Sequence, residues 1–287
     1  MSRIAYVNGR YQPLRSAVIN VEDRGFQFAD GVYEVIAVVD GRCVDLAEHF
    51  DRLDCSLAAL RIPQPMSRAA FSSVVEETAR RNRVGDGLVY MQISRGVARR
   101  DHPFPPNAKP TLVVTARRHV LPKGREDFPG VRVVTARDIR WARCDIKSIS
   151  LLPNVLAKQE ALDKGAFDVW MVDGDGLVSE GSSSNAWIID GRGTVVTRPT
   201  GPEILGGITR DRIISLARED GVEVVERPFT VDDAKAAREA FLTSTTTFLR
   251  SVIRIDDAVI GSGEVGTLSQ RLLDLYITYA RKGIVCR

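Results

Sequence analysis

The sequence has few of the features that mark membrane, secreted or metal-binding proteins. No stretch approaches the roughly 18 uninterrupted apolar residues that a membrane span requires. The N-terminal residues lead directly into an expected strand and turn, without the apolar segment and cleavage site of a signal peptide, so we expect no secretion. The three histidines and four cysteines form no CxxC pair and have no metal-ligand spacing. We therefore expect no metal site, and we expect reduced thiols in a cytoplasmic protein at Cys43, Cys55, Cys144 and Cys286.

The sequence also lacks a large excess of charge of one sign. The net charge of +3 is distributed over interspersed basic and acidic residues. The short basic clusters at 80–83 and 99–100 contain no interleaved aromatic residues and match no known binding motif, which argues against nucleic-acid binding. The hydrophobic content of 44% and the charged content of 27% are typical of a globular protein.

The order of the expected elements predicts an α+β fold with two domains, which a length of 287 residues favours. The segment 119–130 is polar and rich in proline and glycine, as interdomain linkers often are. We therefore expect a small α/β N-terminal domain at 1–118 and a larger mixed-sheet C-terminal domain, which would bind the cofactor, at 131–287.

Hydrophobic periodicity and turn residues place the individual elements. In the first part, strands are expected at 4–7, 10–14, 32–39, 42–45, 88–94 and 111–116, and helices at 46–60 and 67–83. In the second part, strands are expected at 131–135, 167–172, 186–190, 194–197, 222–226 and 239–243, and helices at 153–164, 208–220, 231–238 and 265–282.

Lys147 is the first candidate catalytic residue, because it lies in a partly apolar run at 143–152. Desolvation disfavours a charged ammonium group, and a neutral amine can form a Schiff base with a carbonyl. The aldehyde cofactor that suits such a lysine is pyridoxal 5'-phosphate, which also needs a carboxylate for its ring nitrogen and hydrogen-bond donors for its phosphate. The alternative is that Lys147 is a solvated residue at the edge of a sheet.

Three polar segments could supply that carboxylate and those donors. The turn 179–185 contains Glu180 with Ser182 and Ser183, although a polar turn without further function is the alternative. The glycine pair at 206–207 opens a helix at Ile208, and a helix N-terminus favours anions. The hydroxyl cluster 243–247 is equally suited to phosphate, although it also fits an ordinary turn after a strand.

A second group of residues is suited to a substrate carboxylate. Arg100 and His102 are two positions apart, so in an extended segment both side chains project to the same side and could bind one carboxylate. A basic surface loop is the alternative. Tyr33, at the start of an expected strand, could orient an acidic substrate or could pack against other side chains.

Together these motifs resemble those of the class IV pyridoxal-phosphate aminotransferases. The similar segments follow in order across almost the entire chain, at residues 23–34, 48–53, 139–148, 157–161, 179–185, 207–210 and 244–246. Within that family, Arg100 and His102 with Tyr33 are most similar to the substrate-carboxylate trap of the bacterial D-amino-acid (D-alanine) aminotransferases.

The resemblance implies the two-domain fold type IV of enzymes that use pyridoxal 5'-phosphate, and it implies residue roles. Lys147 would form the Schiff base and move the substrate proton, and Glu180 would pair with the ring nitrogen. The remaining implied cofactor ligands are Arg52, the backbone of Ile208 and Thr209, Thr245, and the serine turn with Ser182 and Ser183. Tyr33, Arg100 and His102 would bind the substrate carboxylate, and the last two would reach across the interface of a homodimer.

The implied reaction is transamination of D-amino acids, in which D-alanine and 2-oxoglutarate give pyruvate and D-glutamate. The expected partners are therefore small D-amino acids and 2-oxo acids, with no nucleic acid and no membrane. A branched-chain L-amino-acid aminotransferase and an aminodeoxychorismate lyase are alternatives with the same fold. A phosphate- or nucleotide-binding protein that is not an enzyme is the alternative from another class.

Overall fold

The computed structural model describes residues 3–124, 127 and 129–282, and it divides into two compact units. The first unit consists of the chain up to Leu121 together with Ile146–Ser150. The second consists of Pro122–Asp145 and the chain from Leu151 onward. Cys286 and residues 125, 126 and 128 of the expected linker lie outside the described residues.

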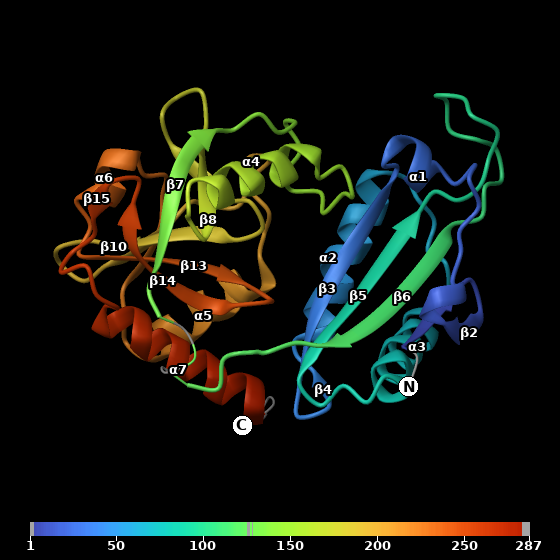
Figure 1. Ribbon diagram of the computed structural model, residues 1–287, viewed down its shortest axis with the longest axis horizontal. Coiled ribbons are helices and arrows are strands. Elements are labelled where there is room, and N and C mark those ends of the chain that lie inside the picture. Colours follow the sequence, from blue (N-terminus) through green and yellow to red (C-terminus); the bar gives the residue numbers. More distant parts are fainter. Residues whose placement is uncertain (1–2, 125–126, 128, 283–287) are drawn as a thin grey trace. The chain divides into compact units, whose positions relative to one another are not determined.

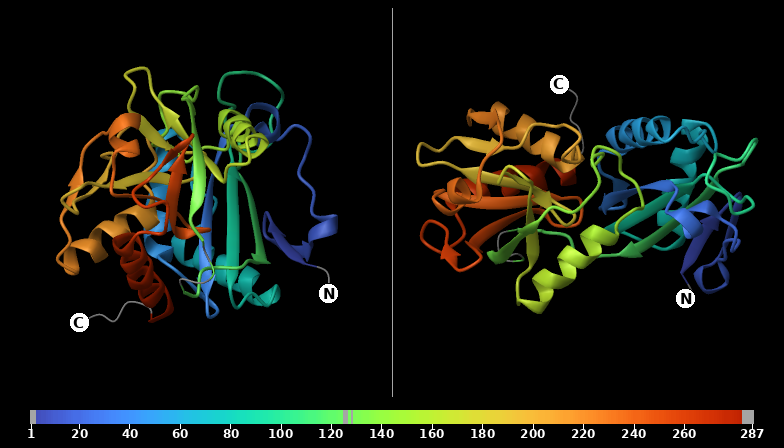
Figure 2. Two further views of the ribbon diagram at one scale, coloured as in Figure 1. Left: turned by 60° about the vertical axis from the view of Figure 1, so that its left-hand side comes forward. Right: turned by 90° about the horizontal axis from the view of Figure 1, so that it is seen from above.

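The first unit is a six-stranded antiparallel sheet with the order β2-β1-β6-β5-β3-β4. Its strands are β1 (Ile4–Val7), β2 (Arg10–Pro13), β3 (Gly31–Val39), β4 (Arg42–Cys43), β5 (Gly87–Ser94) and β6 (Thr111–Arg118). Its helices are the 3-10 turn η1 (Leu14–Ser16), α1 (Arg24–Phe28), α2 (Leu46–Ala59) and α3 (Arg68–Arg81). The last two lie on one face of the sheet (Figure 1 and Figure 2).

Both expected hairpin turns are confirmed. Asn8 and Gly9 have φ values of 44° and 94°, and Asp40 and Gly41 have φ values of 50° and 77°. Two successive residues with positive φ are required by the tight turns that join twisted antiparallel strands, and Asn-Gly and Asp-Gly are the pairs that adopt them most readily. Local turn chemistry therefore fixes the register of β1 with β2 and of β3 with β4.

The segment Ile146–Ser150 belongs to the first unit, although a division of the chain at 119–130 assigns it to the second domain. Ile146 is buried in the core of the first unit. Ser148 forms an isolated antiparallel bridge with Val32 at the start of β3, and the backbone N–H of Tyr33 donates to the carbonyl of Lys147 at 3.0 Å. This backbone pairing has no local signal in the sequence, because its partners are far apart along the chain.

The second unit contains a nine-stranded mixed sheet, which confirms the expected α+β class. The strand order is β12-β11-β10-β13-β14-β7-β8-β9, with β15 on β14. The strands are β7 (Val131–Arg137), β8 (Asp168–Val172), β9 (Val178–Gly181), β10 (Asn185–Ile189), β11 (Val195–Thr197), β12 (Val224–Glu226), β13 (Glu239–Ser244), β14 (Phe248–Ile255) and β15 (Ala258–Val259). The helices are α4 (Leu152–Asp163), α5 (Ile208–Glu219), α6 (Val231–Lys235) and α7 (Thr267–Lys282).

Residues of β13 alternate between the two faces of this sheet, as the pleat requires. Ala240 and Leu242 join a core cluster with α6, whereas Phe241 stacks on Trp187 with ring centroids 5.2 Å apart. Helix α7 packs on β13 and β14 (Figure 1), and α4 packs on β7 and β8. None of the helices in the described parts of the chain is both long and apolar enough to cross a membrane.

Several elements differ from the expectation. The turn expected at 179–185 begins as strand β9, because Val178–Gly181 is buried and pairs with β8. Strand β14 was not expected, since two arginines interrupt its apolar pattern, yet it pairs with both β13 and β7. The short elements α1 and β15 were also missed.

Candidate active site

The expected site residues are divided between the two units, and each set is described within its own unit. The first unit carries Tyr33, Arg52, Arg100, His102 and Lys147, and the second carries Glu180, Ser182, Ser183, Ile208, Thr209 and Thr245. No cluster of histidine, cysteine and acidic residues suited to a metal ion occurs among the described residues.

Lys147 is half-buried and lies beside an aromatic ring, outside any strand. Its Nζ is 4.4 Å from the centroid of the Tyr33 ring. Its backbone N–H donates to Ser56 Oγ of α2 at 3.2 Å, and its carbonyl accepts from Tyr33. The backbone N–H and the carbonyl of Lys147 are thus both hydrogen-bonded, and the amine lies next to Tyr33. Lys147 is therefore paired with β3 through its backbone, and its side chain is half-buried rather than fully solvated.

Tyr33 contacts a second tyrosine on the neighbouring strand. The rings of Tyr33 and Tyr90 are 5.9 Å apart, and the Tyr90 hydroxyl donates to Gln92 at 2.6 Å. Burial, with a smaller contribution from Tyr33, raises the pKa of Tyr90 to about 12. Tyr90 is therefore a neutral donor at physiological pH, and it supports the ring that lies against Lys147.

Arg52 is fixed by a buried carboxylate on β3. Glu34 is fully buried and accepts hydrogen bonds from Arg52 Nε and Nη2, each at 2.7 Å, and its Oε2 lies 2.7 Å from His49 Nδ1. Burial alone would raise the pKa of Glu34, but Arg52 and His49 outweigh it and hold this pKa at about 2. The bidentate pair fixes the orientation of the Arg52 guanidinium.

Arg100 and His102 are exposed on the loop between β5 and β6, and both contact Phe28 at the end of α1. The Arg100 guanidinium carbon is 5.0 Å from the centroid of the Phe28 ring, and the His102 ring is 5.6 Å from it. The two side chains therefore lie on the same aromatic ring.

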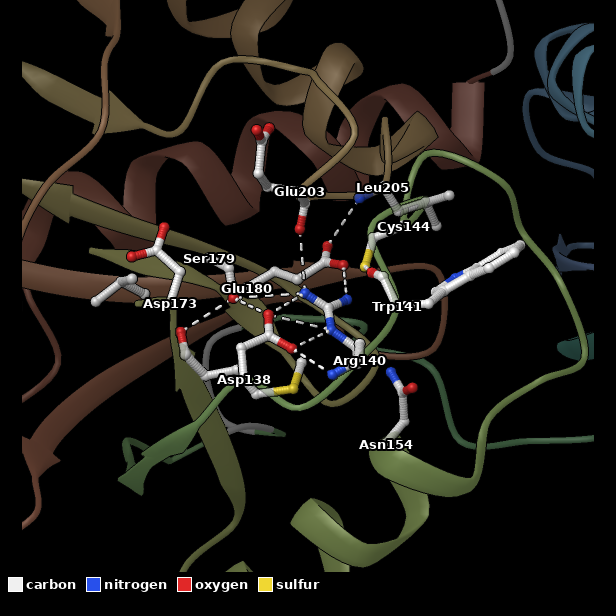
Figure 3. A network of polar contacts seen from close by, with 12 residues as sticks. Asp138, Arg140, Trp141, Cys144, Asn154, Asp173, Ser179, Glu180, Glu203 and Leu205 are labelled. Carbon is white, nitrogen blue, oxygen red and sulfur yellow. Dashed lines mark hydrogen bonds and ion pairs between the residues drawn. The ribbon is translucent and has the colours of Figure 1, made fainter. Parts of the chain in front are cut away.

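Glu180 lies in a buried polar network of the second unit (Figure 3). Arg140 Nη1 donates to Glu180 Oε1, and Arg140 Nη2 forms an ion pair with Asp138 at 2.7 Å. Ser179 Oγ donates to Asp138 at 2.7 Å. Although burial opposes it, these partners lower the pKa of Asp138, and the two carboxylates raise the pKa of Arg140. The cation therefore stays charged between two acids.

The second oxygen of Glu180 faces the start of β10. It accepts from Asn185 Nδ2 at 3.1 Å and from the backbone N–H of Leu205 at 3.2 Å. Asn185 Nδ2 also donates to the Leu205 carbonyl at 2.9 Å. These contacts connect Glu180 to the segment that leads into α5.

The N-terminus of α5 has no capping side chain at its N-cap position. Its N-cap is Gly207, whose backbone is extended and provides no side-chain cap. A Cβ at Gly207 would lie 2.1 Å from Asn185 Oδ1, so only glycine fits there. Ile208 is half-buried and Thr209 is buried, and both belong to the first turn, whose N–H groups point outward from a helix start.

The hydroxyl cluster lies at the same end of the strands. Asn185 of β10 pairs with Thr243 of β13, and the turn 244–247 follows directly. Ser244 Oγ accepts from the Thr247 backbone N–H at 3.2 Å and closes this turn, at which Thr245 is half-buried. Glu180, the start of α5 and this turn therefore surround the beginning of β10.

The serine turn between β9 and β10 is fixed by a buried aspartate. Asp168 accepts from Ser182 Oγ at 2.5 Å and from Ser184 Oγ at 2.8 Å. Asn154 Nδ2 donates to the Ser182 carbonyl at 2.9 Å. Ser183, by contrast, is exposed. Asp168 and Asn154 thus hold the turn that follows Glu180.

Sequence reasoning missed the residues that hold the expected ligands in place. Glu34 had one available signal, because it is a single acid in the apolar strand 31–39. Its partners His49 and Arg52 are three positions apart on a helix, so they share a face. Asp138 pairs with Arg140 only two positions away, but Glu180, the second partner of Arg140, is forty positions further along the chain. Asp168 is fourteen and sixteen positions from its partners Ser182 and Ser184, so no local pattern joins them.

The available groups fit pyridoxal 5'-phosphate. They include an ordered amine at Lys147, a buried carboxylate at Glu180, and a glycine-capped helix start at Gly207 whose close contact with Asn185 leaves no space for a Cβ. Such groups suit an aldehyde, a protonated ring nitrogen and a phosphate respectively.

Comparisons with known proteins agree with this arrangement. The chain matches the family model described as Amino-transferase class IV over residues 31–255. It is 40% identical over 266 residues to D-alanine aminotransferase of Bacillus licheniformis, which covers 92% of this chain and 93% of the relative. It is 36% identical over 273 residues to D-alanine aminotransferase of Listeria monocytogenes serotype 4b, with 94% of each chain covered. The chain belongs to the class IV aminotransferase family.

Solved structures support the same fold. The branched-chain aminotransferase of Thermoproteus uzoniensis with norvaline superposes with a TM-score of 0.88 at 25% identity. A second branched-chain amino acid aminotransferase, solved with pyridoxamine 5'-phosphate, superposes with a TM-score of 0.91 at 26% identity. Each match covers 98% of this chain and 95% of the other chain. The expected two-domain fold type IV architecture is confirmed.

Proposed function

We propose that this protein is a D-amino-acid aminotransferase that converts D-alanine and 2-oxoglutarate to pyruvate and D-glutamate. The observation that carries this proposal is the 40% and 36% identity to D-alanine aminotransferases over more than nine-tenths of the chain. The enzyme uses pyridoxal 5'-phosphate, in line with its family and with the pyridoxamine 5'-phosphate of the similar branched-chain enzyme. The bound cofactor supplies an electron sink for the carbanion formed at the substrate Cα.

Several residues would hold this cofactor. The Lys147 amine would anchor the aldehyde carbon, and Glu180 would accept a hydrogen bond from the protonated ring nitrogen. The phosphate ligands would be Arg52, the backbone N–H groups of Ile208 and Thr209, and the Thr245 hydroxyl, with Ser182 and Ser183 beside the cofactor. The division of the chain into a domain at 1–118, a linker at 119–130 and a cofactor-binding domain at 131–287 is part of this proposal.

Each catalytic residue has a distinct task. The Lys147 amine would accept the Cα proton of the substrate and return it, and this amine lies beside the Tyr33 ring. Arg140 pairs with Glu180 and holds this carboxylate, which would accept from the protonated ring nitrogen.

Tyr33, Arg100 and His102 would bind the substrate carboxylate. Arginine and imidazolium donors bind carboxylates through charge-assisted hydrogen bonds. Where the carboxylate is held decides which face of Cα presents its hydrogen to Lys147, so these residues would select D over L substrates. We further propose a cytoplasmic homodimer in which Arg100 and His102 complete the site of the partner subunit.

Replacement of Lys147 tests the site. We expect Lys147→Ala to lose the yellow colour of the cofactor-bound protein and nearly all transamination, because no amine would hold the aldehyde. Lys164→Ala is a matched control, since the Lys164 side chain is half exposed and pairs with Glu160 near the end of α4. Full activity of the Lys147 variant would refute the assignment.

Replacement of Arg100 tests the carboxylate trap. We expect Arg100→Ala to raise KM for D-alanine while the absorbance of the bound cofactor stays unchanged. An unchanged KM would show that Arg100 does not bind the carboxylate.

Product analysis separates the alternatives. An aminotransferase forms pyruvate from D-alanine only when a 2-oxo acid is present. An aminodeoxychorismate lyase would release pyruvate from its own substrate without an acceptor. A protein that stays colourless when pyridoxal 5'-phosphate is added would instead be a non-enzymatic phosphate binder.

A further inference from the structure

The loop between β5 and β6 is attached to the first unit by two buried arginines. Arg24 and Arg95 are 4% and 5% exposed, and both donate from Nε to Asp30 Oδ2, at 2.8 and 2.7 Å. Arg95 Nη2 also donates to Asp30 Oδ1 at 3.0 Å. Burial alone would raise the pKa of Asp30, but the two arginines outweigh it and lower this pKa. Asp30 is therefore a charged anchor between the two guanidinium groups.

Arg24 connects this anchor to the loop backbone. Its Nη1 donates to the carbonyl of Asp101 at 2.5 Å, and its Nη2 donates to the carbonyl of His102 at 3.2 Å. Its guanidinium carbon lies 4.8 Å from the centroid of the Phe28 ring, which Arg100 and His102 also contact. One buried side chain therefore determines both the backbone next to Arg100 and the ring on which Arg100 lies.

Arg95 attaches the loop at a second point. Its guanidinium carbon lies 3.6 Å from the centroid of the Phe104 ring, and Arg61 lies 4.8 Å from the same ring. Arg95 is itself held by the carbonyls of Leu60 and Arg61, at 2.8 and 3.0 Å. The loop is thus fixed at Phe104 independently of Arg24.

We propose that Arg24 is a positioning residue that fixes the loop at Asp101 and His102 and thereby orients Arg100 and His102 for the substrate carboxylate. This inference rests on the proposed function of those two residues. A planar guanidinium can bind three partners in fixed directions, whereas the single ammonium of lysine cannot. Arg24 does not itself contact substrate.

Loss of Arg24 has a limited effect on the fold for two reasons. Asp30 keeps its pair with Arg95, so its charge remains compensated. Asp101 and His102 are exposed, so water can replace the lost donors to their carbonyls. The expected result of Arg24→Met is therefore a folded protein with a loosened loop.

Limited proteolysis of the cofactor-free protein measures directly how firmly the loop between β5 and β6 is held. Trypsin cleaves after Arg99 and Arg100, and mass spectrometry identifies the fragments. We expect Arg24→Met to accelerate this cleavage by roughly tenfold, from the loss of hydrogen bonds made by a charged group. Cleavage after Lys123 provides an internal reference. Arg192→Met, an exposed arginine near Asp190 in the second unit, provides the matched control.

Steady-state kinetics of the cofactor-loaded enzyme measure how the position of the loop affects substrate binding. We expect Arg24→Met to raise KM for D-alanine by roughly ten- to a hundredfold, as displaced binding groups do, with kcat and the cofactor absorbance almost unchanged. Arg24→Lys, which keeps the charge but cannot bind all partners, should shift both readouts in the same direction. It also serves as the test variant if Arg24→Met fails to fold.

Three results would overturn the proposal. Cleavage after Arg99 and Arg100 at the wild-type rate would show that Arg24 does not hold the loop. Faster cleavage with an unchanged KM would show that the loop position does not matter for substrate. A fall in kcat without a change in KM would indicate a merely structural role.

If the wild type does not transaminate D-alanine, the proposed function fails, and with it the role of Arg24 in substrate orientation. The proteolysis still decides whether Arg24 holds the loop.

Discussion

At the scale of single residues, buried carboxylates held by arginine organise both units. Glu34 fixes Arg52, Asp30 joins Arg24 and Arg95, and Arg140 lies between Asp138 and Glu180 in the network of Figure 3. Removing both charges from water is costly, and bidentate geometry with further hydrogen bonds offsets this cost. Such pairs fix the orientation of their side chains more than they add to the free energy of unfolding.

The Glu34 pair predicts a specific dependence of stability on pH. The pKa of Glu34 in the folded protein is about 2, below its ordinary value of 4.5. The stabilising contribution is therefore fully present above pH 4.5 and is lost as the pH falls towards 2. We expect Glu34→Gln to lower the free energy of unfolding by about 3 kcal/mol at neutral pH and by much less near pH 2.

Chemical denaturation of the wild type and of Glu34→Gln at several pH values measures the difference between their free energies of unfolding. Glu22→Gln, at an exposed position of the same unit, is the control. A constant difference between wild type and Glu34→Gln from pH 7 to pH 2 would contradict the account.

Truncation of the Arg140 side chain is expected to lower the free energy of unfolding strongly. Arg140→Met leaves the carboxylates of Asp138 and Glu180 buried without their shared cation, which costs about 3 to 5 kcal/mol. Adding Asp138→Asn should recover part of the loss by removing one of the two charges. Unfolding of the cofactor-free proteins measures both effects.

Arg143→Met is the matched control for Arg140. Arg143 is half exposed and pairs with Asp145, and a surface pair of this kind contributes about 0 to 1 kcal/mol. Equal losses for the two arginine variants would show that the buried network is not the cause.

Most residues expected to bind the cofactor or the substrate could be identified from the sequence. Most residues that hold them in place could not be identified. Lys147, Glu180 and Gly207 have local motifs, whereas the pairing of Glu180 with Arg140 joins positions forty apart. Nothing in a local pattern identifies such a partner. Ser182 is buried and donates to Asp168, fourteen positions away, whereas the neighbouring Ser183 is exposed.

At the scale of elements, α7 depends on a carboxylate from a different element. Glu239 of β13 accepts from the backbone N–H groups of Leu268 and Ser269 at 3.2 and 2.8 Å, and from Ser269 Oγ at 2.7 Å. A Cβ at Gly266 would lie 2.1 Å from this carboxylate. Glu239 therefore acts as the N-terminal cap of α7, where it also meets the positive end of the helix dipole.

We expect Glu239→Gln to destabilise the second unit by about 1 to 2 kcal/mol, since the cap loses its charge and one acceptor. Thermal unfolding followed by circular dichroism measures the effect. Glu264→Gln, an exposed acid close to the same helix start, should leave the midpoint unchanged. Similar midpoints for Glu239→Gln and the wild type would rule out the capping role.

Element prediction succeeded where local signals are strong. Both hairpins and the long helices have turn or periodicity signals, and the structure confirms them. Strand β14 has an apolar pattern interrupted by Arg250 and Arg254, and its stability comes from pairing with β13 and β7. Tertiary pairing overrides local preference in such strands.

At the scale of the whole molecule, the chain enters the second unit, returns to the first at Ile146–Ser150 and leaves again. This return places Lys147 on the first unit, against Tyr33, although most of the expected cofactor ligands belong to the second. A linear division of the sequence could not show this, because the bridge between Ser148 and Val32 spans more than a hundred positions. The proposed catalytic lysine is therefore attached to the same sheet that carries Tyr33.

The most direct test of the proposed function is a stereochemical assay of the cofactor-loaded wild-type enzyme. D-alanine, L-alanine and L-leucine are each incubated with 2-oxoglutarate, and the 2-oxo acid and the configuration of the glutamate are determined. The account predicts that D-alanine gives pyruvate and D-glutamate, while the L-amino acids react far more slowly. Rapid formation of L-glutamate from L-leucine, without turnover of D-alanine, would contradict it.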